Sequence, residues 1–463
     1  MKANLTQTLA LTAVLFTITT AQASTLTIAL VPSSTLSLAR ANAGVVSLSL
    51  SNSGDQVWII QSSSNLTSWT ETESWKIHNG LYHRSYTNAA GGSLFYRAFY
   101  DVTRQDLAST VTNALLLPAS PFNYAAPVLP ANFSVQPILA QDNMPATNLT
   151  TDAGAALGRV LFYDRRLSTN QTVSCASCHQ QAHGFTDPRQ FSVGFDGSVG
   201  SRNAMGLSNA RWYQRRHFFW DERANTLEDQ VLGPIQNPIE MGMTLNALTN
   251  RLAAEPFYTN LFATTFGTTA VTSDRISRAL AQFVRSIVST RSKYDIGVTN
   301  NFANFTAEEK LGRQIFLGQN GFTATCAACH GTDNFVPGAA INNNGLEFPF
   351  VDKGLGGVTG LAADDGKFKV PSLRNIELTA PYMHDGRFTN LEQVVEFYNS
   401  GVVNNPNLSP PLRNSPGTPN AGQPLRLNLT TAQKAALVAF LKTLTDPNLA
   451  TDEKLSDPFN YGN

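Results

Sequence analysis

The spacing of apolar and polar residues divides the chain into a strand-like part and a helical part. Between residues 25 and 104, apolar residues either alternate with polar ones, as in Val46–Ser51, or form short β-branched and aromatic runs, as in Leu94–Phe99. Alternation with a period of two predicts half-buried strands, and the Gly and Asn clusters between these runs predict turns. We therefore expect a small all-β domain here, built as an antiparallel sandwich.

The helical part follows a proline-rich linker over residues 105–141. Beyond the linker, amphipathic stretches alternate with long loops that contain Gly and Pro. We predict a first helical domain over residues 142–304, a second over residues 305–446, and a C-terminal tail over residues 447–463.

Two stretches of the helical part repeat one another. Leu157–Phe162 reads L-G-R-V-L-F, and Leu311–Phe316 reads L-G-R-Q-I-F. Thr306 and Glu309 form a capping box that predicts the start of a helix just before the second stretch. The repeat predicts that the two helical domains are copies of one unit.

The N-terminus has the pattern of a secretory signal peptide. A basic Lys2 precedes an apolar stretch from Leu9 to Ile18, and Ala21-Gln22-Ala23 forms an A-x-A site. This pattern predicts a signal peptide over residues 1–23, cleaved after Ala23. A membrane anchor is the alternative, but the stretch is too short to cross a bilayer. We expect a periplasmic or secreted protein with no membrane span.

Charge excludes one broad class of function. Lys plus Arg and Asp plus Glu number 33 each, and charged residues make up only 14% of the chain. A nucleic-acid-binding protein needs a basic surface, which this balance does not supply. We therefore expect no nucleic-acid partner.

Cysteine spacing gives the strongest chemical signal. The four cysteines form two copies of C-x-x-C-H, namely Cys175, Cys178 and His179, then Cys326, Cys329 and His330. This motif attaches c-type haem, because two thiols bind the two vinyl groups and the histidine ligates iron. Zinc or redox C-x-x-C sites are the alternative, but two copies in an exported chain favour haem. The sequence predicts two covalently bound haem c groups in duplicated, mainly α cytochrome c-type domains.

Several strings between and after these motifs carry a resemblance to a known family. They are Phe219–Arg223 (F-W-D-E-R), Leu227–Gln230 (L-E-D-Q), Asn237–Met241 (N-P-I-E-M), Pro371–Asn375 (P-S-L-R-N) and Leu378–Gly386 (L-T-A-P-Y-M-H-D-G). In these strings the chain resembles the bacterial dihaem cytochrome c peroxidases and MauG. The resemblance covers roughly residues 142–445 and leaves out the β-rich part.

The resemblance implies catalytic roles for three residues. Glu240 would be the general acid/base that helps to cleave the O–O bond of hydrogen peroxide at the first haem. Gln230 would lie beside it, and Trp220 would relay electrons between the haems. A solvated surface acid is the alternative for Glu240.

The axial ligands separate the two branches of the family. Peroxidases of this family have a histidine after an S-x-G motif, but here Ser192–Gly194 precedes Phe195. His183 could substitute, although we expect it at the surface or near a propionate. An open first haem, as in MauG, is therefore expected.

For the second haem, MauG-like proteins have a tyrosine where peroxidases have a methionine, so Tyr398 is the ligand candidate and Met383 its rival. Tyr398 lies on a helix that we expect to begin with a capping box over Thr389–Glu392 and to end near Gly401.

Family members also bind calcium between the haems. Asn203, Thr379 and Pro381 match the positions that provide its oxygen ligands.

The sequence thus predicts a dihaem peroxidase-type oxidoreductase that reduces hydrogen peroxide, with electrons from a small cytochrome c or a cupredoxin. One alternative is a MauG-like enzyme that uses peroxide to oxidise aromatic residues of a partner protein. Another is a non-catalytic dihaem electron carrier.

Overall fold

A computed structural model describes the backbone of the strands between residues 25 and 100, and residues 115–323, 326–338 and 341–459 in full. The chain divides into two compact units. One comprises Met1–Leu116 with Phe459–Asn463, and the other comprises Leu117–Pro458. The predicted signal peptide lies outside the described residues and stays a prediction.

The first unit contains two antiparallel sheets in its described part. Its strands are β1 (Thr25–Leu30), β2 (Ser34–Asn42), β3 (Val45–Asn52), β4 (Gln56–Ser63), β5 (Thr70–Ile77), β6 (Gly80–Thr87) and β7 (Phe95–Tyr100). One sheet has the order β1-β2-β3-β6 and the other the order β5-β4-β7. The alternating Val46–Ser51 segment falls in β3, which pairs with a strand on each side. Packing of the two sheets into a sandwich stays a prediction.

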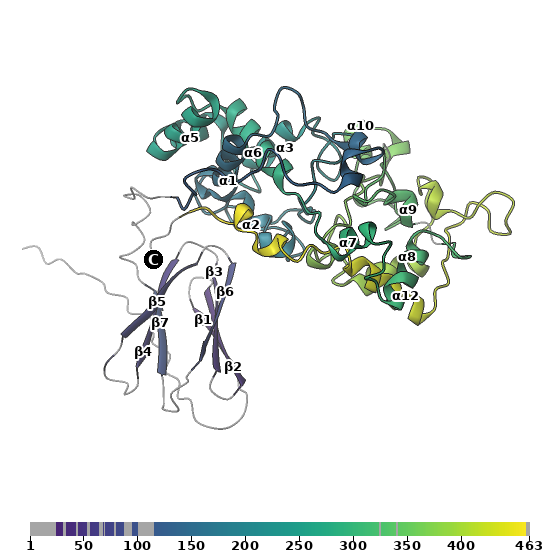
Figure 1. Cartoon of the computed structure of the whole chain (residues 1–463), viewed down its shortest axis with the longest axis horizontal. Coiled ribbons are helices and arrows are strands. Elements are labelled where there is room, and N and C mark those ends of the chain that lie inside the picture. Colours follow the sequence, from purple (N-terminus) through teal and green to yellow (C-terminus); the bar gives the residue numbers. More distant parts are fainter. Residues whose placement is uncertain are drawn as a thin grey trace, which may run out of the picture. The chain divides into compact units, whose positions relative to one another are not determined.

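The second unit is mainly helical. Its α-helices are α1 (Asp152–Tyr163), α2 (Cys175–Cys178), α3 (Leu227–Gln236), α4 (Leu245–Ala253), α5 (Pro256–Phe266), α6 (Ser273–Ser286), α7 (Lys293–Thr299), α8 (Ala307–Phe316), α9 (Cys326–Cys329), α10 (Gly356–Thr359), α11 (Leu391–Glu396) and α12 (Thr431–Lys442). In Figure 1, α1, α3, α5 and α6 gather at one end of this unit, whereas α8, α9 and α12 lie at the other. Among the described residues, no helix has both the length and the hydropathy to cross a membrane.

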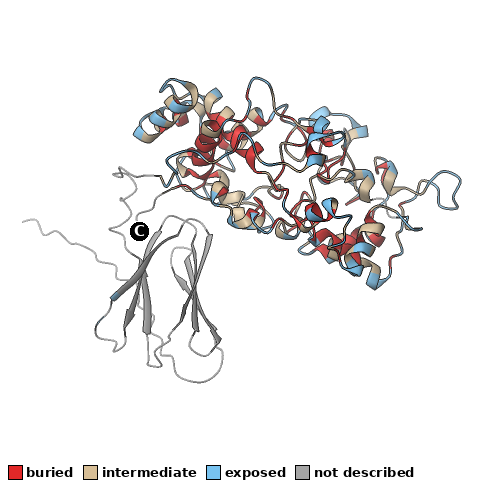
Figure 2. Cartoon of the chain, viewed as in Figure 1, coloured by how far each residue is buried: buried red, intermediate tan, exposed pale blue. Residues whose placement is uncertain are grey.

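The same helix crossing occurs at both ends of the second unit. Helix α1 packs on α6 so closely that a Cβ at Gly158 would collide with the carbonyl oxygen of Ala279. Helix α8 packs on α12 in the same way, with Gly312 against the carbonyl oxygen of Ala436. The two glycines hold equivalent places in the repeated L-G-R stretches, which explains why both copies keep a glycine there. Buried positions concentrate at these crossings (Figure 2). The predicted limits of the two helical domains, residues 142–304 and 305–446, stay predictions.

Two predicted helix starts can be compared with the structure. Thr306 caps α8, and its side chain and that of Glu309 form the expected reciprocal capping box. Helix α11, by contrast, is capped by Asn390, whose side chain accepts a hydrogen bond from the backbone of Gln393. The predicted box over Thr389–Glu392 is therefore wrong by one position, because the short Asn390 side chain caps better than a threonine one residue earlier.

Helix α11 does not end at Glu396 but continues into one π-helical turn, η8 (Phe397–Gly401), which carries Tyr398. The helical segment thus ends at Gly401, as expected.

Upstream, the proline-rich segment forms two short 3₁₀ turns, η2 (Ala131–Ser134) and η3 (Ile138–Gln141). Phe133 and Ile138 from these turns pack in one buried cluster with Trp212.

Candidate active site

Both C-x-x-C-H motifs hold their histidine in the same way. The Nδ1 atom of His179 donates to the carbonyl oxygen of Phe185 (2.9 Å), and that of His330 donates to the carbonyl oxygen of Phe335 (3.1 Å). Both phenylalanines are buried and have left-handed backbones, with φ of 63° and 55°, which turns each carbonyl back toward its imidazole. Such a bond fixes the ring and leaves Nε2 as the nitrogen for iron.

The protonation states also suit iron binding. Burial lowers the pKa of His179, and it lowers the pKa of His330 to about 4. Both imidazoles are therefore neutral near pH 7, as a metal ligand requires. All four cysteines are free and half-buried, so each pair could form two thioether bonds. The donors present fit haem c at both motifs.

A cavity of about 550 Å³ adjoins the first motif and extends toward the second half of the unit. It brings together most of the predicted site residues, which on its lining are Cys178, His179, Asn203, Trp220, Gln230, Glu240, Thr379, Pro381 and Met383. The most distant of these residues, Cys178 and Met383, are more than two hundred positions apart in the chain. Only the fold, therefore, makes them neighbours.

Glu240 lies in the turn that follows α3. The side-chain amide of Asn237 donates to its Oε1 atom (2.8 Å), and its backbone N–H donates to the Asn237 carbonyl oxygen (3.1 Å). Burial raises the pKa of this carboxyl group, although the charge of Arg223 and the bond from Asn237 oppose the shift. Glu240 can therefore exchange a proton nearer to neutral pH than an exposed glutamate can.

The loop that carries Phe195 packs against the Glu240 turn. The backbone N–H of Phe195 donates to the carbonyl oxygen of Glu240 (2.9 Å), and a Cβ at Gly194 would collide with the carbonyl oxygen of Ile239. The ring of Phe195 lies against Gly242. Ser192 and Gly194 line the cavity, whereas Phe195 is not among its lining residues.

Trp220 is held by both halves of the unit. Its indole N–H donates to the carbonyl oxygen of Asn203 (2.8 Å), and its own carbonyl oxygen accepts from the backbone of Lys369 (2.8 Å). Its ring meets the His384 ring edge-on, with centroids 6.4 Å apart, and His384 stacks on Phe368 at 3.8 Å. These contacts leave the indole little freedom to move.

Both ligand candidates for the second haem lie near one amide group. Burial raises the pKa of Tyr398 to about 12, while a hydrogen bond with Asn344 opposes that shift, and Cys326 and Cys329 lie near the same phenol. The Asn344 amide nitrogen also lies 3.6 Å from the sulfur of Met383. Tyr398 and Met383 therefore both lie in the surroundings of Asn344.

The three residues predicted to bind calcium share the cavity lining. Asn203 is buried, and its amide nitrogen donates to the carbonyl oxygens of Arg189 (3.0 Å) and Gln190 (3.2 Å). Within the described part of the chain, no cluster of three or more His, Cys, Asp or Glu side chains could hold a metal ion. A cation here would thus depend on amide and carbonyl oxygens, and calcium stays a prediction.

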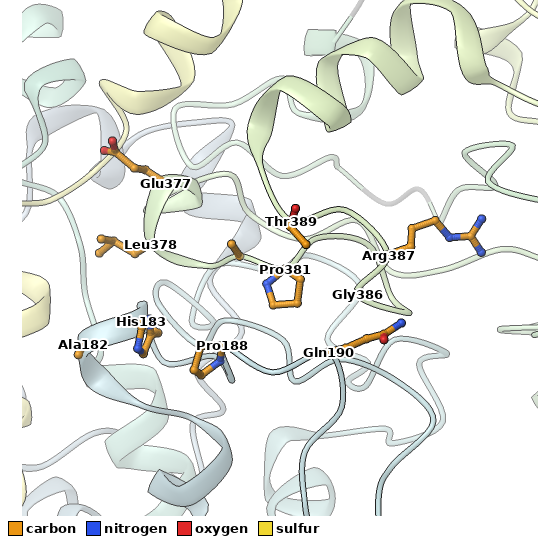
Figure 3. Close-up of a pocket in the computed structure, with 11 residues that line it drawn as sticks. Ala182, His183, Pro188, Gln190, Glu377, Leu378, Pro381, Gly386, Arg387 and Thr389 are labelled. Carbon is orange, nitrogen blue, oxygen red and sulfur yellow. The ribbon is translucent and has the colours of Figure 1, made fainter. Parts of the chain in front are cut away.

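His183 lies elsewhere, in an open groove of about 630 Å³ between residues 182–190 and 377–389. Figure 3 shows His183 and Pro188 on one side of this groove and Leu378 and Pro381 on the other. His183 does not line the cavity beside His179. This placement agrees with a surface residue rather than an axial ligand.

The sequence did not single out Asn237, Arg223, Asn344 or Lys369, which the structure places around the site. Asn237 had a usable signal, because it precedes Glu240 by three residues in the N-P-I-E-M string, and an Asx side chain commonly organises such a turn. Arg223 also had one, because it ends the F-W-D-E-R string. Asn344 and Lys369 act across longer sequence separations and stand outside the quoted strings.

The chain is similar to known proteins of one family. Residues 152–302 match the family model described as di-haem cytochrome c peroxidase. The chain is 38% identical over 276 residues to a cytochrome c551 peroxidase of Nitrosomonas europaea, covering 59% of this chain and 78% of that protein. It is 34% identical over 302 residues to the methylamine utilization protein MauG of Methylorubrum extorquens, covering 65% of this chain and 80% of that protein.

A solved structure is similar as well. It is the crystal structure of a MauG-like protein associated with microbial copper homeostasis, with 34% identity and a TM-score of 0.60, covering 70% of this chain and 99% of that one. The two C-x-x-C-H motifs are evident from the sequence alone, and the matches identify the family to which the protein belongs. The chain belongs to the di-haem cytochrome c peroxidase family and is a peroxidase-type haem oxidoreductase.

Proposed function

We propose that the protein reduces hydrogen peroxide in the cavity beside His179, using electrons that enter near His330. One observation carries the proposal: Glu240, a partly buried carboxyl group with a raised pKa, lines the cavity that His179 also lines. A protein that only carries electrons has no need for a proton-moving group next to an iron ligand. A peroxidase has that need.

The proton chemistry follows from this placement. Reducing peroxide to two water molecules breaks the O–O bond and takes up two protons and two electrons. Glu240 would accept the proton of the bound peroxide and return it to the departing oxygen, while Asn237 keeps the carboxylate oriented. Gln230, on the same lining, would hold the peroxide by a hydrogen bond. Cys175, Cys178 and His179 would hold the haem on this side, and its iron would supply the redox chemistry of O–O cleavage.

Trp220 would carry electrons between the halves. It lines the cavity and is hydrogen-bonded to Asn203 from the first half and to the backbone of Lys369 from the second. A rigidly held aromatic ring between two redox sites shortens each electron-transfer step. Calcium bound by Asn203, Thr379 and Pro381 would support the same region, because Asn203 accepts the indole N–H of Trp220 through its carbonyl oxygen.

A MauG-like reaction, in which peroxide oxidises aromatic residues of a partner protein, is the second candidate. Phe195 favours it, because phenylalanine cannot ligate iron and its ring packs on Gly242. Tyr398 favours it too, since this tyrosine lies near the second cysteine pair. With a small cytochrome c or a cupredoxin as electron donor, the same site would act as an ordinary peroxidase.

The Glu240→Gln variant tests the proposal. Glutamine keeps the size and the hydrogen bond with Asn237 but cannot take up a proton at neutral pH. General acid/base groups contribute about 10²–10⁴-fold, so stopped-flow mixing with peroxide should show a fall of that order with nearly unchanged haem spectra.

Glu377→Gln is the matched control, because Glu377 lines the open groove and not the cavity. It should react like the wild type. A wild-type rate in Glu240→Gln would instead favour the electron-carrier alternative or another proton donor.

A further inference from the structure

Lys369 is a buried cation of the second unit. Only 9% of its surface is exposed, and it lines the cavity that Glu240 and His179 also line. Its backbone is held in place, because its N–H donates to the carbonyl oxygen of Trp220 and the preceding Phe368 pairs with Asn342. The ammonium group is thus anchored inside the protein.

The neighbours of this ammonium group do not neutralise it. Its Nζ atom lies 4.1 Å from the centroid of the Tyr213 ring and 3.6 Å from the sulfur of Met205. No carboxylate of the described residues forms an ion pair with it. Glu222 acts on it from a distance, but this carboxylate already binds Arg215 and accepts the Tyr213 hydroxyl. Burying an unpaired charge is strongly unfavourable.

The other permanent cations of the cavity lining are already paired. They are Arg202, which binds Asp221 and Asp352, Arg223, which binds Asp221, and Arg374, which binds Asp295. Lys369 therefore differs from them in facing the cavity without a partner of its own. A cavity with one unpaired buried cation fits an anionic occupant.

We propose that Lys369 binds a haem propionate carboxylate in this cavity and so positions the haem next to Trp220. A haem is an apolar ring with two carboxylates, so one propionate would supply the negative counter-charge that the described residues do not give this buried lysine. The backbone N–H of Lys369 also donates to the carbonyl oxygen of Trp220. Lys369 would therefore connect the haem propionate to the residue that we propose carries electrons. The inference rests on haem lying in this cavity, and not on Glu240 chemistry.

Thermal unfolding of the holoprotein tests the charge pair by its sign. Lys369→Met keeps the length of the side chain and removes the charge. If a propionate is the partner, the variant leaves that carboxylate buried and unpaired, and Tm should fall clearly. If the ammonium has no partner, its removal relieves an unfavourable buried charge and Tm should rise, which would overturn the proposal.

Resonance Raman spectroscopy provides a second readout on the folded holoprotein. The propionate bending bands of one haem should shift in Lys369→Met and, to a smaller extent, in the milder Lys369→Gln. Excitation that separates the two haems identifies which of them supplies the carboxylate. Unshifted bands in Lys369→Gln would overturn the proposal even if Lys369→Met yields no folded protein.

Lys367→Met is the matched control. Lys367 lies two residues away and forms an ion pair with Asp364 near the surface, so its loss should leave the propionate bands unchanged. Neither readout uses peroxide turnover. A failed peroxidase test with Glu240→Gln would therefore leave this inference standing, and the reverse also holds.

Discussion

The two halves of the haem-binding unit share a scaffold and differ in what faces the haem motif. Gly158 and Gly312 make equivalent helix crossings, and both motif histidines donate to the carbonyl of a left-handed phenylalanine. Around the first motif, however, Glu240 meets a cavity of about 550 Å³. Around the second, Tyr398 and Met383 pack with an apolar cluster, and Met383 also reaches the lining of that cavity.

If the two halves are copies of one unit, as the L-G-R repeat predicts, this is the side on which we expect their functions to differ. The side that holds the histidine is constrained by helix packing and by one backbone hydrogen bond, and both copies keep it. The opposite side is made of loops, which tolerate change because they carry little of the core. In the first half such loops place Glu240 at the cavity. In the second half they place Tyr398 and Met383, whose oxygen and sulfur atoms are of kinds that can bind iron.

Removing either cysteine pair should have the largest effect, because each pair is expected to attach one haem. Cys175→Ala with Cys178→Ala should leave one covalent haem and abolish the reaction with peroxide, whereas Cys326→Ala with Cys329→Ala should leave one haem that still reacts. Denaturing mass spectrometry counts the haems, with two additions expected in the wild type. A wild-type mass with one haem or none would contradict the assignment of both motifs.

Exchanging the candidate ligands of the second haem should have the next largest effect. Tyr398→Phe removes the phenol oxygen and should change the low-spin signal of that haem in electron paramagnetic resonance. Met383→Leu is the matched variant and should leave the signal intact. If the outcomes are reversed, Met383 is the ligand, and the ordinary peroxidase is favoured over the MauG-like reaction.

The features that the sequence predicted correctly are set by residues that lie close together in the chain. The Thr306 capping box and the helix after it depend on residues within a few positions of one another, and the structure has both as predicted. The alternation in Val46–Ser51 likewise predicted strand β3. In each case the determining interactions are local, so spacing alone is informative.

The rest of the site depends on contacts that spacing does not encode. Trp220 meets His384 and the Lys369 backbone across about 150 positions, and Asn344 approaches Tyr398 and Met383 from a separate loop. The shift from Thr389 to Asn390 as the cap of α11 arose from two suitable side chains standing next to each other. Of these two neighbours Asn is the better N-cap, which places the start of α11 after Asn390.

Adding a methyl group at each crossing tests whether the two scaffolds are equivalent. Gly158→Ala and Gly312→Ala should each cost about 1–3 kcal/mol of unfolding free energy or more, because the new Cβ would collide with backbone that cannot move aside. Gly357→Ala, whose Cβ would meet only the Cβ of Lys353 at 3.8 Å, is the control and should be neutral or slightly stabilising. Unfolding followed at the haem absorbance measures the effect, and unequal losses would show that one copy has relaxed its crossing.

The smallest expected effect concerns the pH profile of the first half. Burial raises the pKa of Glu240, and the charge of Arg223 partly opposes that rise. Glu240 must be ionised to accept the peroxide proton, so the rate constant should be highest above this pKa and should fall as the pH drops through it. Arg223→Gln removes the opposing charge, which should move the inflection to higher pH and lower the rate near neutrality while keeping the plateau at high pH.

Arg216→Gln, which removes an exposed arginine outside the cavity lining, should leave the inflection in place. The shift should be modest because the Arg223 side chain is 42% exposed and solvent screens its charge. Stopped-flow rates across the pH range measure both variants, and an inflection that does not move in Arg223→Gln would mean that another group controls the proton transfer.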